Sequence, residues 1–184
     1  MICMRRIGLL SIRNFGLNRL QRIALYILCP AMNSPETPCI RPMTEADLDA
    51  VLLIEKSSFP LPWKREHFLH EIGAPHSYPF VAELDGRIAG YVCLMSLFEE
   101  AQILDIAVAS DQRGSGLGRL LMEKALDIAN EKGAELMALE VRESSAPAIG
   151  LYQALGFKRV GIRTNYYESR ENAVLMEKTI KETT

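Results

Sequence analysis

The sequence predicts an α+β fold in which a mixed, mostly antiparallel central sheet is flanked by helices. Strand patterns follow one another without a helix between residues 78 and 108, and the turn Asp85-Gly86 joins the first two as a hairpin. A helix pattern separates two strands after the glycine-rich stretch 112–118, which allows one parallel step. The 184 residues give room for one domain with one core.

Residues 1–38 differ in composition from the rest of the chain. The first 31 residues contain five arginines and no acidic residue, and Pro30, Pro35 and Pro38 mark a linker behind them. We expect a poorly ordered extension and linker over residues 1–38 and a folded domain over residues 39–184. A targeting segment is a second interpretation, but the apolar patch from Ile23 to Leu28 is short for a signal-peptide core.

The first half of the domain begins with a short strand pattern at Cys39–Pro42. Thr44, with Asp47 three positions later, has the spacing of a helix N-cap, and the apolar pattern behind it predicts a helix that ends near Phe59. The segment PLPW, Pro60–Trp63, predicts a rigid turn. A second short helix and three strands then follow, over Lys64–Ile72, Phe80–Leu84, Ile88–Ser96 and Ile103–Val108.

The second half alternates helix and strand before it ends in two strands. Leucines and alanines at helical spacing from Leu117 onward predict a helix that ends at Gly133. The next elements that we expect are a strand, a helix closed by Gly156, and an antiparallel pair of strands, over Leu136–Val141, Ala146–Leu155, Phe157–Tyr166 and Ala173–Ile180.

The composition is that of an ordinary globular protein, with 48% hydrophobic and 24% charged residues. When the five arginines of the extension are subtracted from the 21 basic residues, 16 remain against 23 acids, a net charge of −7. This acidic body disfavours nucleic acid as a direct partner and favours a basic one. No apolar run reaches the roughly 18 residues of a membrane span. The scattered cysteines predict neither a disulfide scaffold nor structural zinc, so we expect a cytoplasmic protein.

The stretch QRGSGLGRLL, Gln112–Leu121, places three glycines at the mouth of a helix. Unpaired N–H groups in the first helical turn bind phosphate, and glycine lets the ligand approach the backbone. A Walker A loop is excluded because Gly118 is followed by Arg119-Leu120 and not by Lys-Ser/Thr. A dinucleotide fingerprint fits poorly because its third glycine position falls on Arg119 or Leu121, although Glu140 stands where a ribose-binding acid would.

Two segments resemble the GNAT acetyltransferases. The segment RGSGLG, Arg113–Gly118, is similar to that family's R/Q-x-x-G-x-G/A pyrophosphate loop and follows the strand LDIAV, Leu104–Val108. The segment LEVRESSAPAIGLYQALGF, Leu139–Phe157, is similar to the second acyl-CoA segment. The resemblance covers about Ile40 to Ile180, and it implies the GNAT acyl-CoA N-acyltransferase fold and acetyl-CoA as co-substrate, without a metal.

Within this family the match is narrower. The segments FPLPW, LEVR and NYY (residues 59–63, 139–142 and 165–167) and the ending ENAVLM resemble the ribosomal-protein N-terminal-alanine acetyltransferases. This implies transfer of acetyl to the α-amino group of a small-subunit ribosomal protein. The chain departs from that group at Ser145, where asparagine is usual. A serine hydroxyl can still hydrogen-bond a CoA amide.

The resemblance assigns two catalytic residues. Glu140 matches the family's proton acceptor. Such an acceptor is needed because an α-ammonium, with a pKa near 7.7–8.0, must lose a proton before it attacks the thioester. Tyr152 matches the tyrosine that protonates the departing CoA thiolate. The cofactor would be held along the strand and by the loop, where the Val108 N–H can polarise the thioester carbonyl. The residues expected there are Ile106, Ala107, Val108, Arg113, Gly114, Ser115, Gly116, Leu117, Gly118, Arg119 and Ser145.

The substrate side is expected to contain Trp63, Tyr166 and Tyr167 as walls of a peptide channel. Cys93 lies mid-strand without a histidine, which predicts a core thiol and not a covalent acetyl-enzyme. His67, His70 and His76 lack metal-ligand partners. Two alternatives stay open: a GNAT enzyme that acetylates lysine or a small amine, and a non-catalytic acyl-CoA or dinucleotide-binding module.

Overall fold

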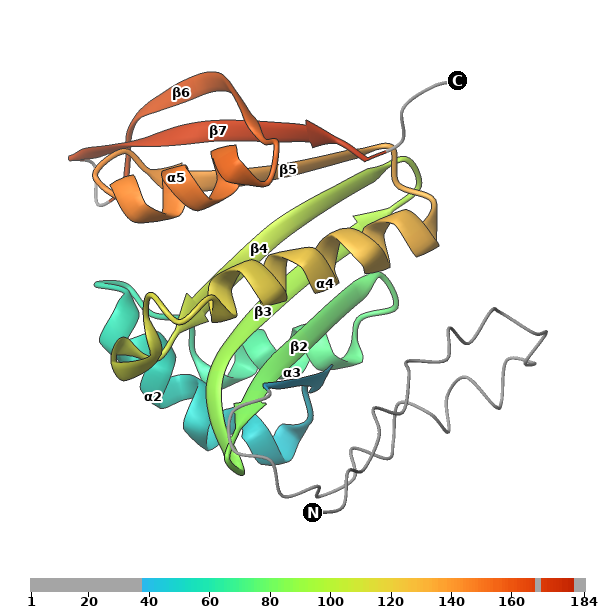
Figure 1. Ribbon diagram of the computed structural model, residues 1–184, viewed down its shortest axis with the longest axis vertical. Helices are drawn as coiled ribbons and strands as arrows, with labels where there is room; N and C mark the ends of the chain where they lie inside the picture. Colours follow the sequence, from blue (N-terminus) through green and yellow to red (C-terminus); the bar gives the residue numbers. More distant parts are fainter. Residues whose placement is uncertain (1–37, 168–169, 181–184) are drawn as a thin grey trace, which may run out of the picture. The chain divides into compact units, whose positions relative to one another are not determined.

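The computed structural model describes residues 38–167 and 170–180, and all of them belong to one compact unit, Ser34–Thr184. The expected extension over residues 1–38 lies outside the described residues except for its last one. The described chain contains seven strands and four α-helices in the order shown in Figure 1. These are β1 (Cys39–Pro42), α2 (Leu48–Ser58), α3 (Arg65–Gly73), β2 (Ser77–Leu84), β3 (Arg87–Leu97), β4 (Glu100–Val108), α4 (Leu117–Lys132), β5 (Leu136–Arg142), α5 (Ala146–Ala154), β6 (Lys158–Tyr167) and β7 (Glu171–Thr179).

The seven described strands form one sheet in the order β1-β2-β3-β4-β5-β7-β6. Every neighbouring pair is antiparallel except β4 and β5, which are parallel because α4 crosses over between them. The predicted α+β class is therefore confirmed. Two strands begin earlier than the sequence indicated, β2 at Ser77 and β4 at Glu100, because each pairs with β3 over that added length.

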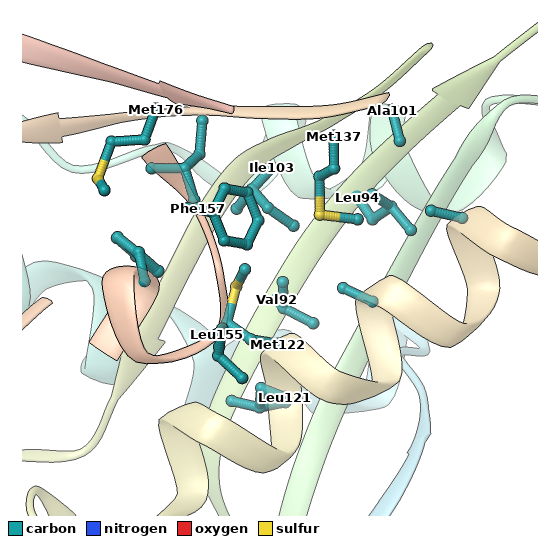
Figure 2. Close-up of a cluster of buried hydrophobic side chains, with 14 of the residues drawn as sticks. Val92, Leu94, Ala101, Ile103, Leu121, Met122, Met137, Leu155, Phe157 and Met176 are labelled. Carbon is teal, nitrogen blue, oxygen red and sulfur yellow. The ribbon is translucent and has the colours of Figure 1, made fainter. Parts of the chain in front are cut away.

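Helices cover both faces of the sheet. On one face, α4 packs over Val92 and Leu94 of β3, in a core to which α5 also contributes; on the other, α2 and α3 pack over Tyr91 and Cys93. The alternation follows from the two-residue period of a strand. Figure 2 shows the first layer, where Leu121 and Met122 of α4 point into the core beneath the sheet. Both are fully buried, and truncation of one such side chain to alanine costs about 2–5 kcal/mol.

The segment after β1 confirms the capping pattern at Thr44. Asp47 accepts hydrogen bonds from the Thr44 N–H and hydroxyl, both at 2.8 Å. The same carboxylate accepts two bonds from the Arg41 guanidinium at 2.7 and 2.8 Å. One 3-10 turn, Glu45–Asp47, precedes α2. The Arg41 hydrogen bonds lower the pKa of Asp47 to about 2, against desolvation that would raise it.

Candidate active site

The two parallel strands separate along their length. β4 and β5 pair only at Glu100–Gln102 with Leu136–Ala138, and beyond that point they diverge, as Figure 1 shows. A cavity of about 320 Å³ lies between the diverging ends. Its lining includes residues 103–106 of β4 and 139–142 of β5. In this region no other described strand pairs with the inner edge of β4 or of β5.

A bulge in β4 lies at the same place. Cys93 of β3 pairs with Asp105 while Leu94 pairs with Ile103, so Leu104 is the extra residue. Bulges bend a strand and re-aim its side chains, and they occur often beside active sites. Past the bulge, the Ala109 N–H donates to Ala89 of β3. Because amides alternate along a strand, Ala107 also faces β3, whereas Ile106 and Val108 present their backbone groups to the gap.

The glycine-rich loop follows β4 directly and leads into α4. Gly114 and Gly116 have φ values of 82° and 93°, a region that glycine adopts without strain. Within the described chain, the N–H groups of Gly114, Gly116, Leu117 and Gly118 have no backbone acceptor. Apart from the two neighbours of Gly116 in the chain, no described residue has an atom within 4 Å of where a Gly116 Cβ would be. The loop therefore offers several free donors at a positive helix end, which suits a pyrophosphate.

The two arginines of this loop do different things. The Arg113 guanidinium turns back and donates to the Val108 carbonyl at 3.2 Å and the Ser58 hydroxyl at 3.0 Å, so its side chain ties the loop to β4 and α2. Arg119 lies on the first turn of α4, 3.7 Å from Glu123, and is about half exposed. Only the second guanidinium is thus placed where it can reach an anion at the helix end.

Both predicted catalytic residues line the cavity. Glu140 lies on β5, and its Oε1 forms an ion pair with Arg163 Nη1 at 2.9 Å. Tyr152 lies on α5 and is 6% exposed, with its ring 6.0 Å from Phe157. Burial raises the pKa of Tyr152 to about 12. Its hydroxyl is therefore protonated throughout the neutral range and can act as a proton donor.

Three aromatic residues and one serine line the other side of the cavity. Trp63, Tyr166 and Tyr167 all line it, as does Ser145 at the start of α5. The two tyrosine rings meet edge to face at 5.1 Å. Arg142 lies over the Tyr167 ring at 4.1 Å, and burial raises the pKa of Tyr167 to about 12. The cavity therefore joins a polar catalytic side to an aromatic wall.

Some predicted residues lie apart from the cavity lining. Of the expected cofactor residues, only Ile106 and Ser145 belong to the lining. Ala107 is buried in the layer beneath α2 and α3, and residues 113–119 lie beyond the end of β4. Cys93 is a fully buried free thiol, as predicted, and burial raises its pKa. Among the described residues no group of His, Cys, Asp and Glu could hold a metal ion.

Sequence reasoning missed two acids in the lining, Glu55 and Asp105. Glu55 is 1% exposed, on the face of α2 that also buries Val51 and Ile54. Asp105 interrupts an apolar strand. A carboxyl group on an apolar face is the signal that could have identified both, because such a group is rarely buried without a partner.

Cys39 is disulfide-bonded, which the spacing of the cysteines did not predict.

Strands β4 and β5 diverge beside a glycine-rich loop that leads into a helix, and a carboxylate and a buried tyrosine line the cavity between them. This is the architecture of an acyl-CoA-dependent N-acyltransferase. Residues 48–157 match the model of the acetyltransferase (GNAT) family. The chain belongs to this family. As a GNAT enzyme it takes the acetyl group from acetyl-CoA and transfers it to an amine.

Similar proteins include ribosomal-protein N-acetyltransferases of two bacteria. An Escherichia coli (strain K12) protein named [ribosomal protein bS18]-alanine N-acetyltransferase is 35% identical over 140 residues, which are 74% of this chain and 94% of the relative. A Bacillus subtilis (strain 168) protein that carries this name provisionally is 41% identical over 145 residues, 78% of this chain and 96% of the relative. The crystal structure of the Escherichia coli ribosomal-protein-S18-alanine N-acetyltransferase superposes with a TM-score of 0.74 at 32% identity, covering 80% of this chain and 97% of that one.

Proposed function

We propose that this enzyme acetylates the N-terminal α-amino group of alanine in the small-subunit ribosomal protein bS18. The names of the relatives support the substrate. The observation that carries the proposal is the shared cavity: Glu140 and Tyr152 line it together with the aromatic wall of Trp63, Tyr166 and Tyr167. An extended peptide terminus that enters along this wall reaches the gap between β4 and β5.

Acetyl-CoA supplies an activated acetyl thioester, and the chain's own groups would bind it. The backbone groups of Ile106, on the edge of β4 that faces the gap, can hydrogen-bond the pantetheine arm as a neighbouring strand would. The Val108 N–H would polarise the thioester carbonyl. The amides from Gly114 to Gly118 would bind the pyrophosphate, and Ser145 would donate or accept one bond to a CoA amide. Arg119 adds a positive charge at the helix end.

Glu140 would accept a proton from the substrate's α-ammonium, directly or through a water. The neutral amine then attacks the thioester carbon, the carbon–sulfur bond breaks, and an amide forms. From the ammonium to the product amide, the substrate nitrogen loses two protons. One of these two protons replaces the one that the CoA sulfur takes up when it leaves as a thiol. Arg163 holds Oε1 of Glu140 and so orients the carboxylate towards this task.

Tyr152 would give its hydroxyl proton to the departing thiolate. Its raised pKa keeps that proton in place until the sulfur carries negative charge. The CoA thiol, with a pKa near 8.5 by analogy to cysteine, is a stronger acid than the Tyr152 phenol. Proton transfer from Tyr152 to the sulfur is therefore complete only when Tyr152 regains a proton. Loss of the hydroxyl should therefore slow turnover without abolishing binding.

The partner would be a basic peptide, because residues 32–184 carry a net charge of −7. We place the activity in the cytoplasm, where ribosomal proteins are made, and assign it to a catalytic domain over residues 39–184. No described helix has the length and apolarity required to cross a bilayer. Direct contact with nucleic acid or a membrane is not expected.

The test is mass spectrometry of unmodified bS18 after incubation with the enzyme and acetyl-CoA. We expect one acetyl group on the terminal alanine and none on lysine. As a matched control, bS18 with a chemically blocked terminus should gain nothing. Acetylation of lysines in the blocked protein at the same rate would favour the lysine-acetylating alternative, and no acetylation of any protein would favour a small amine.

A further inference from the structure

Three polar side chains meet behind the cavity from three different elements. The Tyr91 hydroxyl of β3 is hydrogen-bonded to Oε2 of Glu55 on α2 and to Oδ2 of Asp105 on β4, the latter at 3.0 Å. One hydroxyl has one proton to donate. Both contacts are satisfied when the hydroxyl donates to one carboxylate and accepts from the other carboxyl group in its protonated form. The geometry therefore requires one shared acid proton in this cluster.

The burial of this cluster indicates a role other than stability. Tyr91 is fully buried and Glu55 is 1% exposed, on a helix face that is otherwise apolar. Apolar residues of similar volume commonly stabilise such a position as well as or better than buried polar groups. The network reaches the active site, since Glu55 and Asp105 both line the cavity.

The remaining oxygen of Glu55 holds the substrate wall. Glu55 Oε1 accepts a hydrogen bond from the Trp63 backbone N–H at 2.6 Å. Pro60 and Pro62 have no N–H, so the segment Phe59–Trp63 has few backbone donors with which to anchor itself. Phe59, Leu61 and Trp63 of this segment line the cavity.

Trp63 and Tyr91 are also linked through aromatic ring contacts. The Trp63 ring lies 5.3 Å from the ring of Phe68, which is fully buried and meets the Tyr91 ring edge to face at 5.4 Å. Trp63 is thus tied to Tyr91 both by its ring and, through Glu55, by its backbone. The Tyr91 hydroxyl in turn contacts Asp105 of β4, the residue directly before Ile106 on the edge that faces the gap.

We propose that Glu55, Tyr91 and Asp105 form a positioning network that fixes the Phe59–Trp63 wall against strand β4 and so sets the space for the substrate's first residue. The nature of that substrate rests on the proposed function, whereas the link between wall and strand is a property of the chain alone. These three are positioning residues, because they act on the substrate through the wall.

The network is sensitive to alkaline pH. Burial, and then the charge of Glu55, raise the pKa of Asp105 to about 8. The groups that face Asp105 are Glu55 from α2, Tyr91 and Cys93 from β3, and Tyr152 from α5. Above pH 8 the shared proton is lost, two carboxylates compete for one hydroxyl proton, and the wall loosens.

The single tryptophan makes the wall observable without an activity assay. We would compare Tyr91→Phe with Ser96→Ala, a matched loss of a buried hydroxyl on the same strand, whose oxygen has no hydrogen-bond partner in the described chain. Tyr91→Phe should shift the Trp63 emission to longer wavelength. It should also raise KM for an alanine-starting bS18 peptide about fivefold or more, with KM for acetyl-CoA changed less than twofold. Ser96→Ala should change neither.

A pH titration gives the second readout. Wild-type Trp63 emission should change with a midpoint near pH 8, and Asp105→Asn should remove this transition. Glu55→Gln retains an acceptor for the Trp63 N–H but removes a charge, so it should move the midpoint to lower pH. The His67 ring, 5.8 Å from the Trp63 ring, is unchanged in all of these variants.

Circular dichroism would verify that each variant is folded, and Glu55→Gln replaces Tyr91→Phe if the latter is not. Unchanged Trp63 emission in a folded Tyr91→Phe variant, or an equal rise of both KM values, would overturn the proposal. If emission responds as expected while even the wild type leaves the peptide unmodified, the network stands and the proposed substrate fails.

Discussion

Arg163 of β6 reaches across β7 to Glu140 of β5, with 2.9 Å between Nη1 and Oε1. The ion pair therefore joins the strand that carries the expected proton acceptor to the edge strand that carries the tyrosines of the substrate wall. Arg163 is 54% exposed and Glu140 18%. An ion pair with one exposed partner contributes little to stability, so its main effect is on the orientation of the carboxylate.

Glu140→Gln should lower kcat roughly 10²–10⁴-fold, the range for loss of general acid–base catalysis. The amide keeps the shape of the side chain, so KM for acetyl-CoA should stay within twofold. Arg163→Gln is the control that removes the ion pair, together with the contact between the Arg163 guanidinium and the Tyr166 ring at 5.5 Å, and it should cost less than about tenfold. Steady-state kinetics of both variants decide this. An equal loss in the two would mean that Glu140 acts through the ion pair and not as a proton acceptor.

Tyr152→Phe should lower kcat by about 10²-fold, because thiolate departure loses its proton donor. With the pKa of Tyr152 near 12, the wild-type rate should show no alkaline decline from this residue below about pH 11. Tyr166→Phe removes a hydroxyl from the half-exposed wall and serves as the control, with kcat changed less than threefold. A full rate for Tyr152→Phe would exclude its role as the acid.

Gly116→Ala should weaken acetyl-CoA binding at least tenfold, since φ at 93° becomes strained and a methyl group enters the space for the pyrophosphate. Gly133 ends α4 at φ 94°, so Gly133→Ala carries the same backbone strain far from the loop. Isothermal titration calorimetry should detect weaker binding only in the first variant. Acetyl-CoA, and not NAD, should raise the wild-type melting temperature. Equal stabilisation by NAD would contradict the assignment of this loop.

Acid should destabilise the start of the domain through Asp47. Its pKa is about 2 when folded and 3.8 in the unfolded chain, so its contribution is fully present above pH 4 and is lost as the pH falls towards 2. Urea unfolding at a series of pH values should show a loss on the order of 1–2 kcal/mol over that window. Asp47→Asn should be less stable than wild type at pH 6, and the difference should shrink as the pH falls to 2. A constant difference would contradict this.

The sequence predicted much of the fold because its signals are local. The Thr44–Asp47 cap, the Asp85-Gly86 turn and the glycines that end α4 and α5 all act within a few residues, and each element that they bound is present. The parallel step between β4 and β5 followed from the helix between them. The divergence of these strands and the bulge at Leu104 did not, because they depend on which residues pair across the sheet.

The same limit applies to the site. Glu140, Tyr152 and Ser145 could be proposed from motifs in one contiguous segment. Glu55 lies 36 residues from Tyr91, and Tyr91 lies 14 residues from Asp105, so their meeting depends on strand register and helix packing. The turned-back side chain of Arg113 was equally unpredictable, because its partner Ser58 is 55 residues away.

The acceptor that we propose is an α-amine and not a lysine side chain. The most direct measurement is the initial rate on two peptides of the bS18 terminus: one with a free alanine terminus and no lysine, the other with a blocked terminus and an added lysine. We predict acetylation of the first at least 100-fold faster than of the second, with the rate on the first falling as salt weakens attraction to the acidic enzyme. Equal rates on the two peptides, in low salt and in high salt, would contradict the account.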